Sequence, residues 1–118
     1  MGSDKRILIV EDDSLTSGAI KMLLEWEGYH VDCAANGLEA LHHLRQADEK
    51  PDLILLDVMM PILNGYQFRE EQKRDPAINP IPVIVVSVID SAFSPDASGH
   101  IQKPFQPEQL LEAIRSQA

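Results

Sequence analysis

Residues 52–57, Asp-Leu-Ile-Leu-Leu-Asp, decide the fold, because four large apolar residues run without a break into the carboxylate of Asp57. A continuous apolar run of this length is typical of a strand buried on both faces, as in parallel sheets covered by helices. The carboxyl end of such a strand is where α/β folds bind their ligands. Packing gives no reason for a carboxylate at that point, so Asp57 is either solvated at a sheet edge or placed to react.

The sequence on both sides of this run alternates between strand and helix patterns. Short apolar runs at 6–10, 29–34, 81–88 and 101–103 predict four more strands. Four helices are predicted between or after them: one capped by Asp13 or Ser14, bearing Leu15, Ala19, Met22, Leu23 and Trp26 and stopped by Gly28; one capped by Asn36, bearing Leu38, Leu41 and Leu44; one from Tyr66 toward Arg74; and one starting at Pro107.

This alternation predicts an α/β fold, since consecutive strands that pair in parallel need right-handed helical crossovers. We therefore expect a three-layer sandwich, with a five-stranded parallel sheet between two layers of helices. The carboxyl ends of all the strands then meet at one edge of the sheet. The residues expected at that edge are Glu11, Asp12, Asp57, Ser87 and Lys103.

Length and composition set limits on function. The 118 residues suffice for one domain, with residues 1–5 as a flexible N-terminus or a cloning remnant. The net charge of −9 argues against direct nucleic-acid binding, and no apolar run is long enough to span a membrane. Nothing at the N-terminus resembles a secretory signal. The single cysteine, Cys33, is interpreted as a small buried hydrophobe, and the expected location is cytoplasmic.

Four sequence elements together resemble the receiver domain of two-component response regulators, and the resemblance covers nearly the whole chain. These elements are the acidic pair Glu11-Asp12, Asp57 followed by Met60-Pro61 and Gly65, Ser87 thirty residues after Asp57, and Lys103-Pro104-Phe105. The resemblance implies a single receiver domain over 1–118 with a flavodoxin-like fold and strand order 2-1-3-4-5. It also implies a cis Lys103-Pro104 peptide bond.

Three carboxylates at one sheet edge are difficult to keep ionised without a cation, and hard oxygen ligands suit Mg²⁺. By resemblance, Asp12 and Asp57 would bind Mg²⁺ directly, Glu11 through water, and Met59 through its backbone carbonyl. The carboxylate of Asp13 is a further candidate ligand, although the alternative role as a helix cap fits its position better. By resemblance, Asp57 would accept a phosphoryl group from a sensor histidine kinase, a phosphotransfer protein or a small phosphodonor.

Phosphoryl transfer depends mainly on positioning and charge neutralisation. Lys103 would neutralise charge on the phosphoryl oxygens, and the Ser87 hydroxyl would donate a hydrogen bond to one of them. Movement of Ser87 toward the phosphate would then change the surface of the domain. His100 occupies the position where the family often carries an aromatic switch residue, and a plain surface histidine is the equal alternative.

One segment departs from the family pattern. The chain between Ser87 and Lys103 is shorter than usual by more than a helical turn, and Pro95 interrupts a run of small polar residues. We therefore expect the helix that the family places between its fourth and fifth strands to be missing or reduced to a turn. The family uses that face for dimerisation and output, so the usual output geometry is not assured.

The resulting hypothesis is a phosphoacceptor receiver domain that uses Mg²⁺ and switches a protein-interaction surface. By resemblance it is not an enzyme but a phosphoryl acceptor that assists its own phosphorylation and dephosphorylation. Its output domain or partner is unknown, and a homodimer is one option. One alternative is a receiver-like module that binds its partner independently of phosphorylation. Another is a phosphatase of the haloacid dehalogenase type, which would need a second acid where this chain has Met59.

Overall fold

The computed structural model describes residues 5–57, 63–87 and 97–117, and these form one five-stranded sheet with helices on both sides. The strand order is β2-β1-β3-β4-β5, and every neighbouring pair is parallel. This confirms the expected α/β fold and its 2-1-3-4-5 order. The elements are β1 (Arg6–Val10), α1 (Ser14–Trp26), β2 (His30–Ala34), α2 (Gly37–Gln46), β3 (Leu53–Asp57), α3 (Gly65–Arg74), β4 (Val83–Ser87), β5 (Gly99–Gln102) and α4 (Pro107–Gln117).

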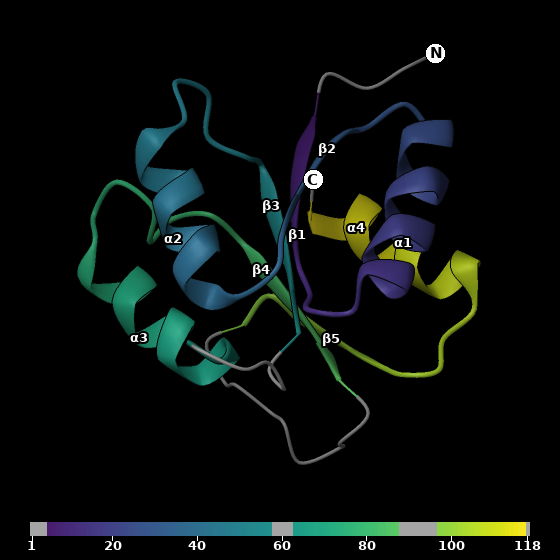
Figure 1. Cartoon of the computed structure of the whole chain (residues 1–118). Helices are drawn as coiled ribbons and strands as arrows, with labels where there is room; N and C mark the ends of the chain where they lie inside the picture. The colour runs from purple at the N-terminus through teal and green to yellow at the C-terminus, as the bar shows by residue number, and fades with distance from the viewer. Residues whose placement is uncertain (1–4, 58–62, 88–96, 118) are drawn as a thin grey trace.

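The helices form two layers, with α2 and α3 on one face of the sheet and α1 and α4 on the other (Figure 1). Successive residues of a strand point to opposite faces, so each central strand supplies both cores. In β1, for example, Leu8 faces the core under α2 and α3, whereas Ile9 faces the core under α1 and α4. Burial on both faces explains why the strand sequences are continuously apolar instead of alternating.

β3 lies at the centre of the sheet, between β1 and β4, and all five of its residues are buried. Its register places Leu56 beside Val10, the last residue of β1. Asp57 is therefore the last residue of a fully covered strand, level with the start of the acidic loop that follows β1. The register of the sheet thus carries Asp57 to the edge where Glu11 and Asp12 lie.

The ends of the helices follow the signals in the sequence. Asp13, Asn36 and Asn64 cap α1, α2 and α3, and Asn64 forms a reciprocal capping box with Gln67. Gly28 ends α1 with φ 98°, and the N–H groups of Gly28 and Tyr29 donate to the carbonyls of Glu25 and Leu24. This is a Schellman motif, and its left-handed residue strongly favours glycine.

Most of the apolar residues that predict the first helix lie on its solvent side. Leu15, Met22 and Trp26 are 84%, 74% and 87% exposed, whereas Leu23 is partly buried against the core. The buried residues of α1 are Ser17, Ile20 and Leu24. The helix carries two apolar rows, and the one that faces the sheet includes a serine, which hides it from a periodicity search.

Cys33 is exposed, so its interpretation as a buried hydrophobe was also wrong. It lies on β2, an edge strand, where Val31 and Ala34 are buried but Asp32 and Cys33 are not. The helix layers cover an edge strand only partly, so an apolar residue there need not enter the core.

The connection between β4 and β5 spans residues 88–98, of which 88–96 lie outside the described residues. The expectation that a helix is missing or reduced there concerns mainly those residues. The described part of the chain contains four helices, which agrees with this expectation. The flanking strand β5 carries exposed His100 and Gln102 on either side of buried Ile101. The Lys103-Pro104 peptide bond after β5 is cis, as expected. None of the described helices is long and apolar enough to cross a membrane.

A buried polar pair on α3 holds the loop that leads into β4. The Arg69 guanidinium donates to the Gln72 side-chain oxygen at 2.6 Å. Gln72, which is fully buried, in turn donates to the carbonyl oxygens of Ile78 and Ile81, at 3.0 and 3.1 Å. Buried loop carbonyls need such donors, so this pair replaces the hydrogen bonds that the loop would otherwise make with water.

The start of α2 contacts Leu63, which lies shortly before α3. This contact leads to a prediction about stability. The Gly37 N–H donates to the Leu63 carbonyl oxygen at 2.9 Å, and a Cβ at Gly37 would clash with that oxygen. We expect Gly37→Ala to lower the free energy of unfolding by about 1–3 kcal/mol, the usual cost of forcing atoms into a packed site. Urea denaturation followed by circular dichroism measures this.

Gly18→Ala is the matched control, because Gly18 lies within α1 and an added methyl group there would have nothing within 4 Å of it. Alanine at this position should raise the free energy of unfolding by about 0.5–1 kcal/mol through helix propensity. Equal effects of the two substitutions would contradict the proposed steric role of Gly37.

Candidate functional site

Three carboxylates meet at the carboxyl edge of the sheet. Glu11 and Asp12 directly follow β1, and Asp57 ends β3. One oxygen from each carboxylate lies within 4.8 Å of the others, as the sequence predicted. Glu11 and Asp57 are 6% and 7% exposed, whereas Asp12 is open to solvent. The register of the parallel strands is sufficient to produce this convergence.

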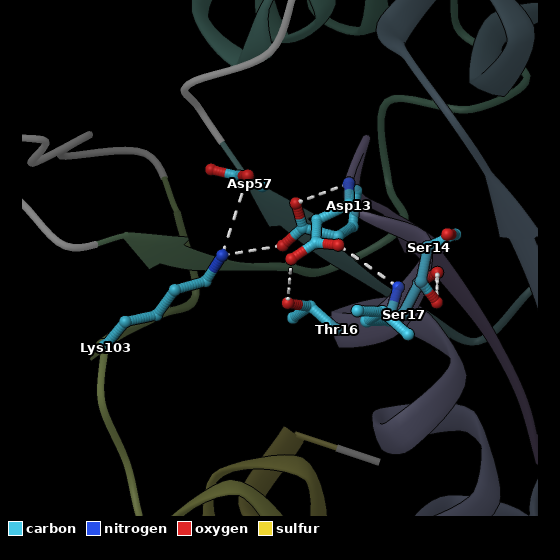
Figure 2. Close-up of polar contacts among 8 residues, drawn as sticks. Asp13, Ser14, Thr16, Ser17, Asp57 and Lys103 are labelled. Carbon is cyan, nitrogen blue, oxygen red and sulfur yellow. Dashed lines mark hydrogen bonds and ion pairs between the residues drawn. The ribbon is translucent and has the colours of Figure 1, made fainter.

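Lys103 brings a positive charge to the carboxylates from the edge of the sheet, since it directly follows the edge strand β5. Its Nζ lies 2.6 Å from Glu11 Oε1 and 3.6 Å from Asp57 Oδ2, and Figure 2 shows the side chain extended toward Asp57. The backbone N–H of Lys103 donates to the Ser87 carbonyl at 2.7 Å, which fixes the base of the side chain beside the end of β4. The sequence predicted Lys103 at the site but did not indicate that Glu11 is its nearer partner.

The electrostatics of the site follow from burial and crowding. Burial raises the pKa of Glu11, and the Asp57 carboxyl raises it further, while the hydrogen bond from Lys103 opposes both. For Lys103, burial by itself lowers the pKa, but the hydrogen bond to Glu11 and the charge of Asp57 outweigh it, so the pKa is raised. Lys103 is therefore a firmly protonated cation that compensates two crowded acids.

Asp13 acts as the cap of α1. Its Oδ1 accepts from the Leu15 N–H at 3.1 Å and its Oδ2 from the Thr16 hydroxyl at 2.7 Å. The Thr16 hydroxyl and the Leu15 N–H lower the pKa of Asp13, because both hydrogen bonds favour the ionised form. Both oxygens thus point into the helix, which confirms the cap and argues against the alternative role as a metal ligand.

Of the other predicted site residues, the structure describes Ser87 and His100 but not Met59. Ser87 ends β4 at the same edge, beside Gln102 in the sheet, and is 4% exposed. His100 lies on β5 opposite Val85 and is exposed. Met59 lies outside the described residues. The proposed roles of Ser87, His100 and Met59 therefore stay predictions.

The donor set suits a hard divalent cation. Carboxylate oxygens are the ligands that Mg²⁺ prefers, and two of these three carboxylates are buried, where uncompensated charge is expensive. The exposed Asp12 leaves the cluster open to solvent on one side, which suits an ion that keeps several of its waters. Glu11, Asp12 and Asp57 are thus the described residues that could hold a metal ion.

Comparison with known proteins identifies the family. The model of the response regulator receiver domain matches residues 7–115. The chain belongs to this family. Receiver domains of two-component systems act as phosphoryl acceptors and not as conventional enzymes, and they interact with histidine kinases or phosphotransfer proteins.

Two curated relatives show how this receiver domain compares in length with whole proteins. Protein PilH of Pseudomonas aeruginosa is 35% identical over 117 residues, which cover 94% of this chain and 95% of PilH. A probable transcriptional regulator, ycf29 of Pyropia yezoensis, is 35% identical over 94% of this chain, but the match covers 52% of that protein. The chain therefore spans about half the length of several relatives that it matches.

Solved structures agree on the fold. The chemotaxis response regulator CheY4 of Vibrio cholerae superposes with a TM-score of 0.87, at 27% identity over 98% of this chain and 100% of that one. The receiver domain of the sensor histidine kinase PA1611 from Pseudomonas aeruginosa has a TM-score of 0.84 at 24% identity, covering 98% of each chain. That receiver was crystallised with a magnesium ion coordinated in its active site cleft.

Proposed function

We propose that this receiver domain accepts a phosphoryl group on Asp57, with Mg²⁺ bound by the neighbouring acids, and that phosphorylation switches a protein-interaction surface. The observation that carries the proposal is the position of Asp57: a buried carboxylate at the end of β3, within 4.8 Å of two other acids and 3.6 Å from Lys103 Nζ. Three acids compensated by one lysine are costly to hold together at a largely buried site, so their presence supports a reactive role.

In the proposed reaction, an oxygen of Asp57 attacks the phosphorus of the donor. A bond forms between that oxygen and phosphorus, while the bond from phosphorus to the donor nitrogen of a phosphohistidine, or to the carboxyl oxygen of acetyl phosphate, breaks. The electron pair of the broken bond leaves with the donor. Protein groups need only position the reactants and neutralise charge, because the transition state of phosphoryl transfer is loose.

Lys103 is the residue proposed to follow the transferred charge. It contacts both Glu11 and Asp57 and is 20% exposed at its side chain, so its Nζ could pass from Glu11 to a phosphoryl oxygen on Asp57 without crossing the core. Ser87, at the end of the neighbouring strand, is proposed to donate its hydroxyl hydrogen to a second phosphoryl oxygen. A shift of Ser87 would pull on the chain that follows β4 and so reach the surface.

The proposed metal ligands are Asp12 and Asp57 directly and Glu11 through water, with the Met59 carbonyl as the fourth contact by family resemblance. When bound, Mg²⁺ would neutralise charge that develops on the phosphoryl oxygens. Asp57 would thus serve both as ligand and as nucleophile. The ion would also reduce the electrostatic repulsion between Asp57 and Glu11.

Incubation with Mg²⁺ and acetyl phosphate, followed by intact-mass measurement, tests the proposed function. We expect one phosphoryl adduct on the wild-type chain and none on Asp57→Asn, because the amide cannot form the acyl phosphate. Asp48→Asn, which removes the same charge from an exposed loop residue, should retain the adduct.

Other outcomes of this measurement favour the competing functions. The absence of an adduct on the wild-type chain would support a binding module that acts independently of phosphorylation. Steady release of phosphate from a phosphate ester would support a phosphatase instead. An adduct that persists in Asp57→Asn would place the acceptor at another residue.

The surface of α1 supports a phosphodonor protein as the partner. The exposed residues Leu15, Met22 and Trp26 form one apolar row along this helix, with Ala19 between them. Beside the row lies a groove lined by residues of α1 together with Phe105 and Pro107, two and four residues after Lys103. Exposed apolar patches next to a reaction centre are typical of protein-binding surfaces. A sensor histidine kinase or phosphotransfer protein bound there would lie beside Asp57.

Alanine at both Met22 and Trp26 separates protein docking from chemistry. With a sensor kinase selected because it phosphorylates the wild-type chain, we expect transfer to slow by about tenfold or more, since buried aromatic anchors often contribute over 1.4 kcal/mol to an interface. Phosphorylation by acetyl phosphate should stay unchanged, because both side chains are exposed and lie in the second half of α1, whereas the acidic loop joins the start of this helix.

The matched control is Leu38→Ala, since Leu38 is 59% exposed on α2, on the opposite face of the sheet. It should leave both reactions unchanged. If Met22→Ala with Trp26→Ala behaves like the control in the kinase assay, the donor protein binds elsewhere.

A further inference from the structure

We propose that Asp13 is a positioning residue for the metal site, and that it acts by orienting Glu11 through the cap of α1. This inference rests on the proposed function, because it concerns the same cluster of acids. It assigns to Asp13 neither a place among the metal ligands nor a role through its charge. What matters is the hydrogen bonding on both sides of this residue.

On one side, Asp13 is fixed to the helix. Its two carboxylate oxygens accept from the Leu15 N–H and the Thr16 hydroxyl, and its carbonyl oxygen accepts from the Ser17 N–H at 3.0 Å. Its backbone is extended, with φ −84° and ψ 108°, as expected for a residue that precedes a helix. Three hydrogen bonds to the first turn of α1 thus set where its backbone lies, and Figure 2 shows the one from Thr16.

On the other side, Asp13 contacts the cluster of acids through its backbone. Its N–H donates to Glu11 Oε2 at 3.2 Å. The other oxygen of the same carboxylate, Oε1, accepts from Lys103 Nζ. The Glu11 carboxylate therefore lies between a mobile side-chain donor and a backbone donor whose position depends on the cap.

These two donors have different roles in the proposed reaction. Lys103 is expected to leave Glu11 for the phosphoryl group, whereas the Asp13 N–H cannot move unless the start of α1 moves. The backbone donor thus keeps Glu11 oriented toward the cluster when the lysine is engaged elsewhere. Preorganised donors of this kind spare a site the cost of ordering its ligands when the ion binds.

Isothermal titration with Mg²⁺ tests this role, using two substitutions that remove the same charge. Alanine at Asp13 removes both cap bonds, while asparagine is an equally good cap residue. We expect Asp13→Ala to raise the Kd for Mg²⁺ by about threefold to tenfold relative to Asp13→Asn. This factor corresponds to the free energy that a helix cap typically contributes. Thr16→Val, which removes the hydroxyl alone, should fall between wild type and Asp13→Ala.

Asn36→Ala is the control for lost helix capping in general, since Asn36 caps α2 through a 2.8 Å hydrogen bond from the Glu39 N–H. It should lower thermal stability as Asp13→Ala does but leave the Kd for Mg²⁺ unchanged. Equal loss of affinity in Asp13→Asn and Asp13→Ala would mean that Asp13 acts by charge or as a ligand, and would overturn the inference. Unchanged affinity in Asp13→Ala would overturn it as well, while the proposed function would stand. A wild-type chain that does not bind Mg²⁺ would overturn both.

Discussion

The structure depends on the need to compensate three carboxylates that the sheet brings together at one edge. Two unit charges 4.8 Å apart repel each other by roughly 3–4 kcal/mol at an effective dielectric constant of about 20. That is a large fraction of the 5–15 kcal/mol by which a domain of about this size is typically stable. The 2.6 Å contact between Lys103 and Glu11 offsets part of this repulsion, and a divalent cation would offset more. Under the proposed function, this site would take up a cation and then a phosphoryl group.

The fold produces this edge by simple means. Parallel strands end on the same side of a sheet, so residues at 11, 12, 57, 87 and 103 become neighbours although the sequence separates them. Pairing of β3 with β1 on one side and β4 on the other sets the position of Asp57 at this edge. The surrounding caps and loops then set the finer geometry: Asp13 fixes the acidic loop to α1, and the Gly37–Leu63 contact ties the start of α2 to the chain that leads into α3.

Several features could be predicted from the sequence because they depend on local chemistry. The strand order, the convergence of Glu11, Asp12, Asp57 and Lys103, and the capping role of Asp13 all follow from apolar runs, turn residues and family motifs. The face of α1 that contacts the sheet could not be predicted, because the helix has two apolar rows and the buried one contains Ser17. The exposure of Cys33 depends on the edge position of β2, and the choice of Glu11 as the nearer partner of Lys103 depends on side-chain geometry across the sheet. Spacing in the sequence encodes neither.

A crystal structure of the chain with Mg²⁺ and trifluoroberyllate, a stable mimic of the phosphoryl group, would show whether Lys103 follows the transferred charge. We expect the beryllium on Asp57, with Lys103 Nζ within hydrogen-bond distance of a fluoride and no longer at 2.6 Å from Glu11. A structure in which the mimic lies on Asp57 while Lys103 still contacts Glu11 as before would contradict the claim that this lysine follows the transferred charge.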